Sequence, residues 1–396
     1  MFRKSILILS VILATASVAD AQKKQRAKVV CGPYVQHAST TGFTVSWETD
    51  LDAVAWVEIA PDDGTHFYGK ERQKFYDLRG QGVHPIGKIH HIKVDGLTPG
   101  TKYRYRIMSR GVISYDAPGR IEYMRDAGTN VHRGQPYVTS TLKESYDTLR
   151  FEMYNDIHGQ DSILNVLMKG RERTPDFVFI NGDMTSNIIK KDMIRDMYLK
   201  TISKNLEGTL PLFMSRGNHE LRGRDAIKWF DYFQTPTGSP YYAFSIGKFF
   251  FVVVDACEDK PDSDIEYCGI VASEPYMERQ EKWLKEVMES EACKNAEVRI
   301  AFCHVPPVAK GWYGNVQVCE RLVPALNKAD IDLMLCGHIH KWRVTEPDGT
   351  VSNAEFPVIC NPNIQRMEVT ATGNSIGLRT VDKNGKVTHT HTINLK

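Results

Sequence analysis

The sequence predicts an all-β domain followed along the chain by a larger α/β domain. Residues 29 to 142 alternate apolar and polar side chains with a period of two, which is typical of half-buried strands. From residue 148 onward, short apolar runs alternate with loops and helical patterns, which indicates an α/β sheet. Polar blocks follow five of these runs, at the carboxyl ends of the predicted strands. Because ligands bind at those ends in open α/β sheets, we expect the second domain to carry the functional site.

Residues 1–21 have the pattern of a removable signal peptide. Arg3 and Lys4 precede an apolar run from Ile6 to Leu13, and Ala19-Asp20-Ala21 has the small-x-small form of a cleavage site. The apolar run is shorter than the roughly 20 residues that span a bilayer. We therefore expect an exported protein, periplasmic or secreted, with no membrane contact after cleavage. A retained membrane anchor is the alternative.

The charge balance excludes a general attraction for polyanions. The formal net charge is +2, whereas nucleic-acid-binding domains are strongly basic, so we expect no nucleic-acid partner. The eight cysteines are an even number, which permits disulfides in an exported chain without revealing their pairing. No C-x-x-C spacing accompanies Cys303 or Cys336, so we interpret these thiols as small core residues. The sequence leaves the oligomeric state open.

Three segments of the first domain are the clearest predicted strands. Thr44–Trp47, Ala55–Ile59 and Tyr103–Ile107 alternate at period two, with turn residues between them. The stretch from Gly96 to Lys102 contains a Pro-Gly turn that leads into the third strand, where a tyrosine can fix a sandwich corner. This sequence pattern resembles the one in the fibronectin type III-like amino-terminal domain of purple acid phosphatases. The resemblance implies a sandwich of that kind for residues 29–142.

The second domain is predicted to span residues 148–396. Apolar residues recur at helical spacing over Ile188–Leu206 and Met277–Met288. Tyr241–Ser245 and Lys248–Asp255 are expected to form a hairpin, and further strands are expected toward the carboxyl end. The five runs that precede the polar blocks are Leu149–Tyr154, Phe177–Ile180, Leu210–Met214, Val298–Phe302 and Ile331–Leu335.

The polar blocks supply three carboxylates, one amide and five imidazoles. Side chains two apart in an extended segment project from the same face, so Asp156 and His158 can bind one cation together. Asp183 can share its two oxygens between two ions, as bridging carboxylates do in two-metal sites. Nitrogen and oxygen ligands without thiolate favour Zn, Mn or Fe(II). The blocks are Asp156-Ile157-His158, Gly182-Asp183, Gly217-Asn218-His219-Glu220, Cys303-His304 and Gly337-His338-Ile339-His340.

Each block alone also has an ordinary structural interpretation. A Gly-Asp pair is a common turn, and His304 ahead of two prolines is a typical loop residue. His338 and His340 fit an alternating strand. The order of five blocks behind five apolar runs favours one joint site over five separate features.

The ordered set D-x-H, G-D, G-N-H-E, H and G-H-x-H resembles the calcineurin-like metallophosphoesterase family over residues 148–345. The resemblance implies a β-sandwich flanked by helices, a small-molecule phosphoester substrate and two divalent metal ions. It leaves His219 free of metal as a general acid or transition-state donor, with Glu220 fixing its orientation. It assigns Asp156, His158, Asp183 and His340 to one metal, and Asp183, Asn218, His304 and His338 to the other.

Two positions depart from true purple acid phosphatases. Their first block is D-x-G and their second is G-D-x-x-Y, whose tyrosine binds Fe(III) and gives the colour. Here those positions hold His158 and Ser186, so we expect a colourless enzyme with two divalent ions and near-neutral activity. A water shared by two such ions becomes a hydroxide, which we expect to attack phosphorus in line without a protein nucleophile.

These observations lead to an exported phosphoric-ester hydrolase, with a phosphomonoesterase as the main hypothesis. A phosphodiesterase is the alternative, because the same metal core serves both reactions. A second alternative is an extracellular binding module with a silent phosphatase domain, although the complete ligand set favours a catalytically active domain. Candidates for the substrate entrance are Arg216, Arg222, Lys310, Trp312 and Tyr313, with the last two as an aromatic ledge.

Overall fold

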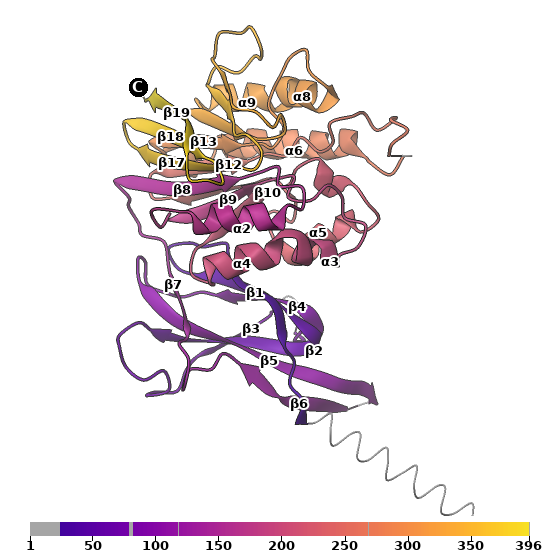
Figure 1. Ribbon diagram of the computed structural model, residues 1–396, viewed down its shortest axis with the longest axis vertical. Coiled ribbons are helices and arrows are strands. Elements are labelled where there is room, and N and C mark those ends of the chain that lie inside the picture. The colour runs from indigo at the N-terminus through magenta and orange to yellow at the C-terminus, as the bar shows by residue number, and fades with distance from the viewer. Residues whose placement is uncertain (1–23, 79–81, 118, 268, 396) are drawn as a thin grey trace, which may run out of the picture.

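The structure is a computed structural model that describes residues 24–78, 82–117, 119–267 and 269–395 (Figure 1). The predicted signal peptide lies outside the described residues. A sheet-rich amino-terminal part occupies the lower half of the view, and a larger part with two sheets and covering helices occupies the upper half. Within the described ranges, no helix is long and apolar enough to cross a membrane.

The strands of the amino-terminal part form one hydrogen-bonded sheet. The prediction of separate strands at Thr44–Trp47 and Ala55–Ile59 is wrong, because both segments lie on one long strand, β2 (Phe43–Pro61). In the polar stretch between them the pairing of β2 with β4 shifts its register between Glu48 and Ala53, and the strand continues without a turn. The first half of β2 pairs with β1 and β4, and the second half with β3 and β5. The other strands are β1 (Val29–Gln36), β3 (Lys74–Tyr76), β4 (Gly87–Val94), β5 (Lys102–Ala117), β6 (Arg120–Gly128) and β7 (Tyr137–Ser140).

The predicted strand Tyr103–Ile107 lies within β5, and the turn ahead of it is fixed as the sequence predicts. The Thr98 amide donates a hydrogen bond of 2.9 Å to the Tyr103 hydroxyl. The Gly100 amide donates to the Leu142 carbonyl, also at 2.9 Å, and Gly100 has a positive φ of 58°. That backbone conformation is readily adopted by glycine, which explains the residue at this position.

Two six-stranded sheets form the larger part, with the orders β10-β9-β8-β17-β18-β19 and β11-β12-β13-β14-β16-β15. In the first sheet β8, β9 and β10 are parallel, and in the second β12, β13, β14 and β16 are parallel. The runs that precede the polar blocks are β8, β9, β10, β13 and β14, each within two residues of its predicted ends. The bounds are β8 (Thr148–Tyr154), β9 (Phe177–Asn181), β10 (Leu212–Ser215), β11 (Tyr242–Ile246), β12 (Phe249–Val253), β13 (Val298–Phe302), β14 (Leu333–Cys336), β15 (Arg343–Thr345), β16 (Val358–Cys360), β17 (Arg366–Thr372), β18 (Ser375–Val381) and β19 (Val387–Asn394).

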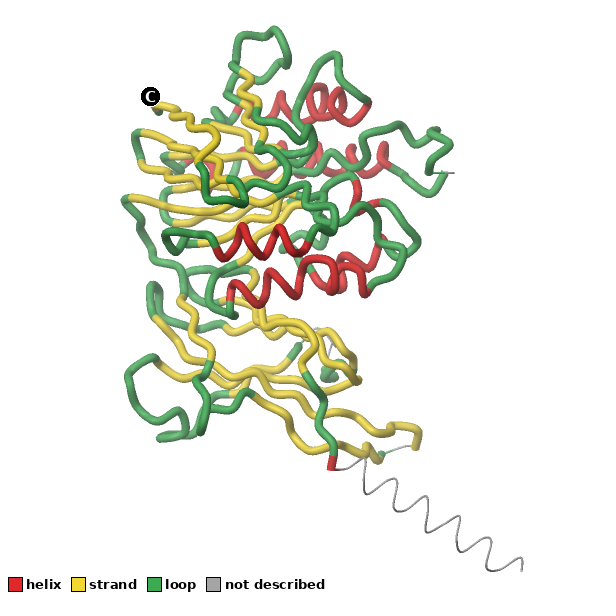
Figure 2. The backbone as a smooth tube through the Cα atoms, in the orientation of Figure 1, coloured by secondary structure: helices red, strands yellow, loops and turns green. Residues whose placement is uncertain are grey.

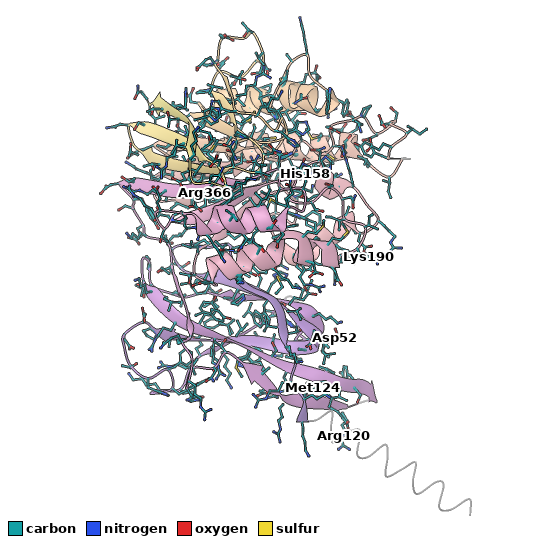
Figure 3. All side chains as sticks on the ribbon, in the orientation of Figure 1. Asp52, Arg120, Met124, His158, Lys190 and Arg366 are labelled. Carbon is teal, nitrogen blue, oxygen red and sulfur yellow. The ribbon has the colours of Figure 1, made fainter. Side chains whose placement is uncertain are left out.

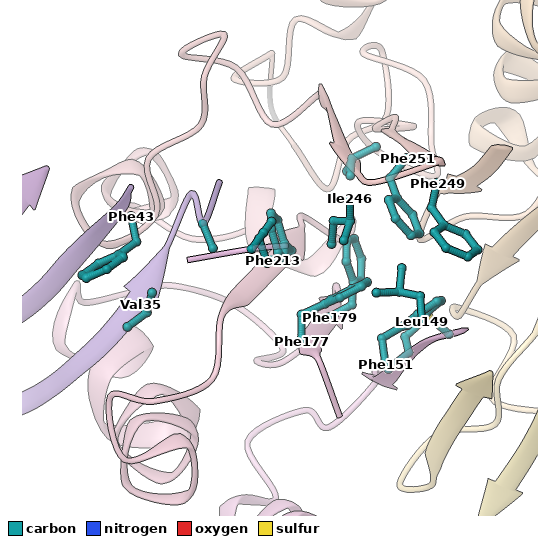
Figure 4. Close-up of a cluster of buried hydrophobic side chains, with 14 of the residues drawn as sticks. Val35, Phe43, Leu149, Phe151, Phe177, Phe179, Phe213, Ile246, Phe249 and Phe251 are labelled. Atoms are coloured by element: carbon teal, nitrogen blue, oxygen red, sulfur yellow. The ribbon is translucent and has the colours of Figure 1, made fainter. Parts of the chain in front are cut away.

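Aromatic side chains fill the space between the two sheets (Figure 4). Phe179 of β9 stacks on Phe302 of β13, with ring centroids 3.7 Å apart. Phe151 of β8 meets Phe251 of β12 edge to face at 5.9 Å. Because successive side chains of a strand point to opposite faces, the intervening residues of these strands face outward. The predicted β-sandwich is therefore confirmed.

Helices cover the outer face of each sheet (Figure 2). Side chains of α2 (Asp161–Lys169) and α4 (Lys200–Leu206) share a buried cluster with the outward residues of β8, β9 and β10. Side chains of α6 (Ser273–Met288) and α9 (Val323–Lys328) share another with β12, β13 and β14. The remaining helical segments are α3 (Asp192–Ile194), η1 (Arg195–Leu199), η2 (His219–Leu221), η3 (Ala226–Lys228), α5 (Trp229–Tyr232), α7 (Glu291–Lys294), α8 (Tyr313–Gln317) and η4 (Val318–Leu322).

The helix predicted over Ile188–Leu206 begins later than expected, at Asp192. Ile188 belongs instead to a loop, because its amide donates a hydrogen bond of 2.7 Å to the Arg222 carbonyl. The helical stretch is also interrupted by a turn of π-helix, η1, ahead of α4. The helix predicted over Met277–Met288 is confirmed within α6.

The buried core continues from the amino-terminal sheet into the larger part. Val35, Phe43 and Phe213 belong to one cluster of buried side chains (Figure 4). The Tyr105 hydroxyl donates a hydrogen bond of 2.6 Å to the carbonyl of Gly208, just beyond α4. The two parts are therefore held against each other by both apolar and polar contacts.

Candidate metal centre

The five polar blocks meet at the edge where the parallel strands of both sheets end. Within the described residues, three groups of side chains place their ligand atoms within 4.8 Å of one another. Asp183 belongs to two of these groups, as does His158, which is labelled in Figure 3. The groups are Asp156, His158 and His340; His158, Asp183 and His219; and Asp183, His304 and His338.

Several ligand candidates share an unusual backbone conformation. Their φ angles are positive, which costs a non-glycine residue on the order of 1 to 3 kcal/mol. Asp and His tolerate this region better than most residue types, so the residue types suit both the backbone and the ligand role. The strained positions are Asp156 (φ 51°), His158 (φ 47°), Asp183 (φ 53°), His338 (φ 68°) and His340 (φ 57°).

One group forms around the buried carboxylate of Asp156. Its Oδ2 accepts hydrogen bonds from Asn155 Nδ2 at 2.6 Å and from the His338 amide at 2.9 Å. Its Oδ1 faces the imidazoles of His340 and His158, whose Nε2 atoms lie 3.1 and 3.8 Å away. Sequence reasoning missed Asn155, although it directly precedes the first block. Because Asn155 binds Oδ2 of Asp156, the other oxygen of this carboxylate, Oδ1, is free to face the imidazoles.

The other group forms where Asp183 meets His304. The distance from Asp183 Oδ2 to His304 Nε2 is 3.0 Å. His304 Nδ1 lies 2.7 Å from the Asn181 carbonyl, an acceptor, so Nδ1 carries the hydrogen and Nε2 faces the carboxylate. A backbone carbonyl behind the imidazole is the usual arrangement around a metal-ligating histidine. His338 Nδ1 lies 3.2 Å from Asn218 Oδ1, which brings the amide into the same group.

The two buried carboxylates dominate the electrostatics of the site. Burial lowers the pKa of His304, but the charges of Asp183 and Asp156 outweigh burial and raise this pKa to about 10. Burial and the positive charge of His304 lower the pKa of His338 to about 4. Burial raises the pKa of Asp183, whereas His304 and His219 outweigh it and hold this pKa below its usual range. The carboxylates therefore require positive charge between them, which a proton on His304 provides in the metal-free protein.

His219 is held by contacts on two sides. Its Nδ1 lies 2.9 Å from the Ser186 carbonyl, so this nitrogen carries the hydrogen. Its Nε2 lies 3.3 Å from Arg222 Nη1 and 3.9 Å from Asp183 Oδ2. Ser186 also touches His158, since its Oγ lies 3.3 Å from His158 Nδ1. The imidazole of His219 thus faces the ligand groups without belonging to either predicted metal set.

Glu220 is placed differently from the role that the resemblance implies. The Ser186 carbonyl orients His219, while the buried Glu220 carboxylate accepts hydrogen bonds from the amides of Asp183, Met184 and Gly217 at 2.8 to 2.9 Å. Burial and the Asp183 charge raise the pKa of Glu220 to about 7. Glu220 therefore joins the loop after β9 to the loop after β10, and its contact is with the backbone of the candidate ligand Asp183.

The side chains are compatible with a pair of metal ions. Asp156 Oδ1 and His304 Nε2 are buried, and each faces another member of the ligand groups, His340 Nε2 at 3.1 Å and Asp183 Oδ2 at 3.0 Å. Mixed oxygen and nitrogen donors of this kind suit divalent transition metals. Asp183 can contribute to both groups because it belongs to two of the three clusters.

Two family models match the chain. Residues 149–342 match calcineurin-like phosphoesterases, and residues 32–118 match the purple acid phosphatase N-terminal domain. The chain belongs to the calcineurin-like phosphoesterases. It is therefore a hydrolase that acts on phosphoester bonds, preceded by a purple acid phosphatase N-terminal domain.

Curated relatives agree with this family. Purple acid phosphatase 23 of Arabidopsis thaliana is 23% identical, over 77% of this chain and 72% of the relative. Purple acid phosphatase 21 of the same plant is also 23% identical, over 80% of this chain and 67% of the relative. The serine/threonine-protein phosphatase CPPED1 of Mus musculus is 24% identical, over 46% of this chain and 58% of the relative.

Solved structures share the fold of this phosphoesterase. The purple acid phosphatase PPD1 from yellow lupin (Lupinus luteus) seeds superposes with a TM-score of 0.64 at 15% identity, over 91% of this chain and 74% of the other. A structure of PhoD superposes with a TM-score of 0.59 at 13% identity, over 91% of this chain and 88% of the other. At these identities the likeness concerns the fold alone.

The predicted entrance residues of the phosphoesterase lie in different surroundings. Trp312 is 65% exposed, and its ring meets His338 edge to face at 6.0 Å. Tyr313 is turned toward Glu274, to which its hydroxyl donates a hydrogen bond, so the two aromatic residues do not form one ledge. Arg216 is largely buried in an ion pair with Asp255 at 2.7 Å, while Arg222 touches His219. Lys310 is exposed.

Proposed function

We propose that the protein is an exported phosphomonoesterase that uses two divalent metal ions, namely Zn, Mn or Fe(II). The sharing of Asp183 between two ligand groups supports this proposal most strongly. Asp156, His158, Asp183 and His340 would hold one ion, and Asp183, Asn218, His304 and His338 would hold the other. The substrate is a small-molecule phosphoester, and we expect no nucleic-acid partner.

Two bound cations would polarise the phosphoryl oxygens and make an attacking water acidic enough to react near neutral pH. The chain itself supplies the groups that position the ester. His219 carries hydrogen on Nδ1 toward Ser186, so Nε2 is the nitrogen that takes up and donates a proton on the leaving-group side. Displacement is in line and requires no phosphorylated protein residue.

Donors around the ligand groups favour a monoester over a diester. Arg222 Nη1 lies beside His219 Nε2, and Asn218 Nδ2 is a buried donor without a partner. A terminal phosphate carries more negative charge and more free oxygens than a diester, so it makes better use of these donors. A phosphodiesterase using the same site remains the alternative reaction.

The domain limits belong to the same proposal. Residues 1–21 would be removed on export, residues 29–142 would form a fibronectin type III-like domain, and residues 148–396 would form the catalytic domain. The strands β1 to β7 fall within the first range and β8 to β19 within the second, which supports this division.

The test compares a chromogenic phosphomonoester with the corresponding diester, using purified protein with and without a chelator. We expect chelator-sensitive hydrolysis with the larger kcat/KM for the monoester. Asp183→Asn, which removes the shared ligand, should lower both the metal content and kcat by roughly a thousandfold or more. A full rate in this variant, or a preference for the diester, would contradict the proposal.

A further inference from the structure

A cavity of about 880 Å³ opens directly beside His219. Ser186 and Arg222 line it, and these are the two residues that hold the His219 imidazole, at 2.9 and 3.3 Å. The cavity thus begins at the two neighbours of His219, the side chain that would donate to the leaving group in the proposed reaction. A group attached to the leaving oxygen would extend toward its mouth.

The cavity is walled largely by apolar side chains. Leu221, Phe230 and Tyr276 line its interior, and two isoleucines stand at its rim. Ile227 is 69% exposed and Ile270 is 80% exposed. Ligand cavities are typically apolar with a few polar groups at one end, and here the polar end is the phosphoester site.

The positive charges near the inner end of the cavity are already neutralised by the protein. Arg216 pairs with Asp255 at 2.7 Å. Arg222 pairs with Glu258 at 2.9 Å and with Asp259 at 3.0 Å. These two guanidinium groups therefore create no demand for a second anionic group on the ligand. The other two arginines of the lining, Arg224 and Arg279, are exposed to solvent, so the apolar wall dominates the interior of the cavity.

A second cavity, of about 730 Å³, extends the apolar surface toward the amino-terminal sheet. The two cavities share Phe230 and Gly238. Phe75 of β3 and Phe233 line the second one. Phe230, Phe233 and Phe75 thus place apolar surface along these cavities toward β3, although Lys74, Lys93 and Asp95 line the second cavity as well. The combined length suits an elongated occupant better than a compact one.

We propose that these adjoining cavities bind the alcohol part of the substrate, and that the preferred substrates are phosphate monoesters of long apolar alcohols. This inference rests on the proposed phosphomonoesterase function, because it places the leaving group at His219. Burial of each additional methylene then strengthens binding in the transition state as well as in the ground state.

The experiment measures kcat/KM for ethyl, butyl, hexyl and octyl phosphate with the metal-loaded protein. These alcohols have nearly the same acidity, so the chemical step stays constant while the apolar length changes. We expect kcat/KM to rise by about tenfold or more from ethyl to octyl phosphate. Equal values across a series that is readily hydrolysed would overturn the inference and leave the phosphomonoesterase standing. Failure to hydrolyse any of these monoesters, with turnover of a diester, would overturn the proposed function instead.

Variants at the cavity rim test the location. Ile227→Asp and Ile270→Asp place a charge beside the apolar surface at exposed positions, and Ile86→Asp is a matched control on an exposed isoleucine of the amino-terminal part. We expect the ratio of kcat/KM for octyl over ethyl phosphate to fall at least about fivefold in the rim variants and to be kept in the control. A ratio that both rim variants retain would overturn the assignment of this cavity.

Discussion

Ser186 touches two imidazoles of the metal centre with two different atoms. Its hydroxyl lies 3.3 Å from His158 Nδ1, and its carbonyl accepts the Nδ1 hydrogen of His219 at 2.9 Å. True purple acid phosphatases have a tyrosine at this position. The small side chain of Ser186 leaves room for the imidazole of His158, and its backbone fixes the tautomer of His219.

The substitution of serine for tyrosine predicts the absorption spectrum of the protein. Without a phenolate at position 186, no tyrosine-to-iron charge transfer is available from this residue. We expect the purified protein, and the protein reloaded with iron in air, to lack a visible charge-transfer band. Absorption spectra and metal analysis of the same samples check this. A purple preparation with a stoichiometric iron content contradicts the ligand set.

His219 predicts a dependence on the leaving group. If Nε2 protonates the leaving oxygen, His219→Ala lowers kcat by about a hundredfold to ten-thousandfold for an alkyl phosphate. The loss is much smaller for 4-nitrophenyl phosphate, whose leaving group needs no proton. Steady-state rates on both substrates check this, with the exposed His132→Ala as control. Equal losses on the two substrates would show that His219 acts on the phosphoryl oxygens instead.

The side chains of the site were easier to predict from the sequence than the contacts between them. Asp156, Asp183 and His304 follow strands, and their convergence follows from strand order. The bonds from Glu220 to the Asp183 amide and from His219 to the Ser186 carbonyl depend on how two loops meet in space. No local pattern in the sequence encodes how these two loops meet, so the sequence alone does not reveal that the Ser186 carbonyl, rather than Glu220, contacts the His219 imidazole.

The loops after the strands, rather than the strands, carry the strain of the site. The positive φ angles at His158, Asp183 and His340 are held by short polar loops, and the carboxylates in these loops are balanced by positive charge on His304 in the metal-free protein. Metal binding would offset the strain. We expect chelation to lower the melting temperature, and the addition of metal to restore it.

Glycine and alanine variants of one ligand separate strain from side-chain loss. His340→Gly and His340→Ala both remove the imidazole, but only glycine relieves the φ of 57°. In chelated protein we expect the glycine variant to be more stable than the alanine variant by about 1 kcal/mol. His219, in the short helical turn η2, should show the reverse order. Denaturant unfolding measures all four variants, and the same order at both positions would contradict the strain.

For helices and strands, the sequence predicts the boundaries correctly where a segment is uniformly buried. It predicts them wrongly where the hydrogen-bonding partner changes along the segment. Val298–Phe302 is buried between sheet and helices, and its predicted ends are those observed. In β2 the polar residues after Glu48 resemble a turn, yet the strand continues because its second half pairs with β5. At Ile188, the apolar periodicity of a helix is overridden by backbone bonds to the loop around Arg222.

The amino-terminal part supports the segment that lines both cavities. His91 Nε2 lies 2.8 Å from the Asp231 carbonyl, and the Tyr34 hydroxyl donates to the Tyr232 carbonyl at 2.8 Å. Both carbonyls belong to α5, which carries Phe230 of the cavity wall. The amino-terminal sheet would thus shape the proposed substrate path from outside the two sheets of the larger part.

One ion pair across this interface is buried enough to matter for the whole molecule. Glu48, 3% exposed on β2, lies 3.1 Å from Arg195 Nη1 and accepts a hydrogen bond of 3.0 Å from the Tyr232 hydroxyl. Removing Glu48 leaves the Tyr232 hydroxyl without its acceptor, while Arg195 keeps its pairs with Asp192 and Asp196, so the loss costs about 1 to 3 kcal/mol. We expect Glu48→Ala to lower the free energy of unfolding by that amount, as measured by denaturant titration.

The control for Glu48→Ala is an ion pair inside the amino-terminal sheet. Asp126 pairs with Arg110, but both side chains are about 40% exposed, so Asp126→Ala should cost less than about 1 kcal/mol. Because the apolar core runs from Phe43 to Phe213, we also expect the wild type to unfold in a single calorimetric transition. Two separated transitions in the wild type would mean that the amino-terminal sheet and the catalytic sheets fold independently. Equal losses of unfolding free energy in the two variants would mean that Glu48 does not couple them.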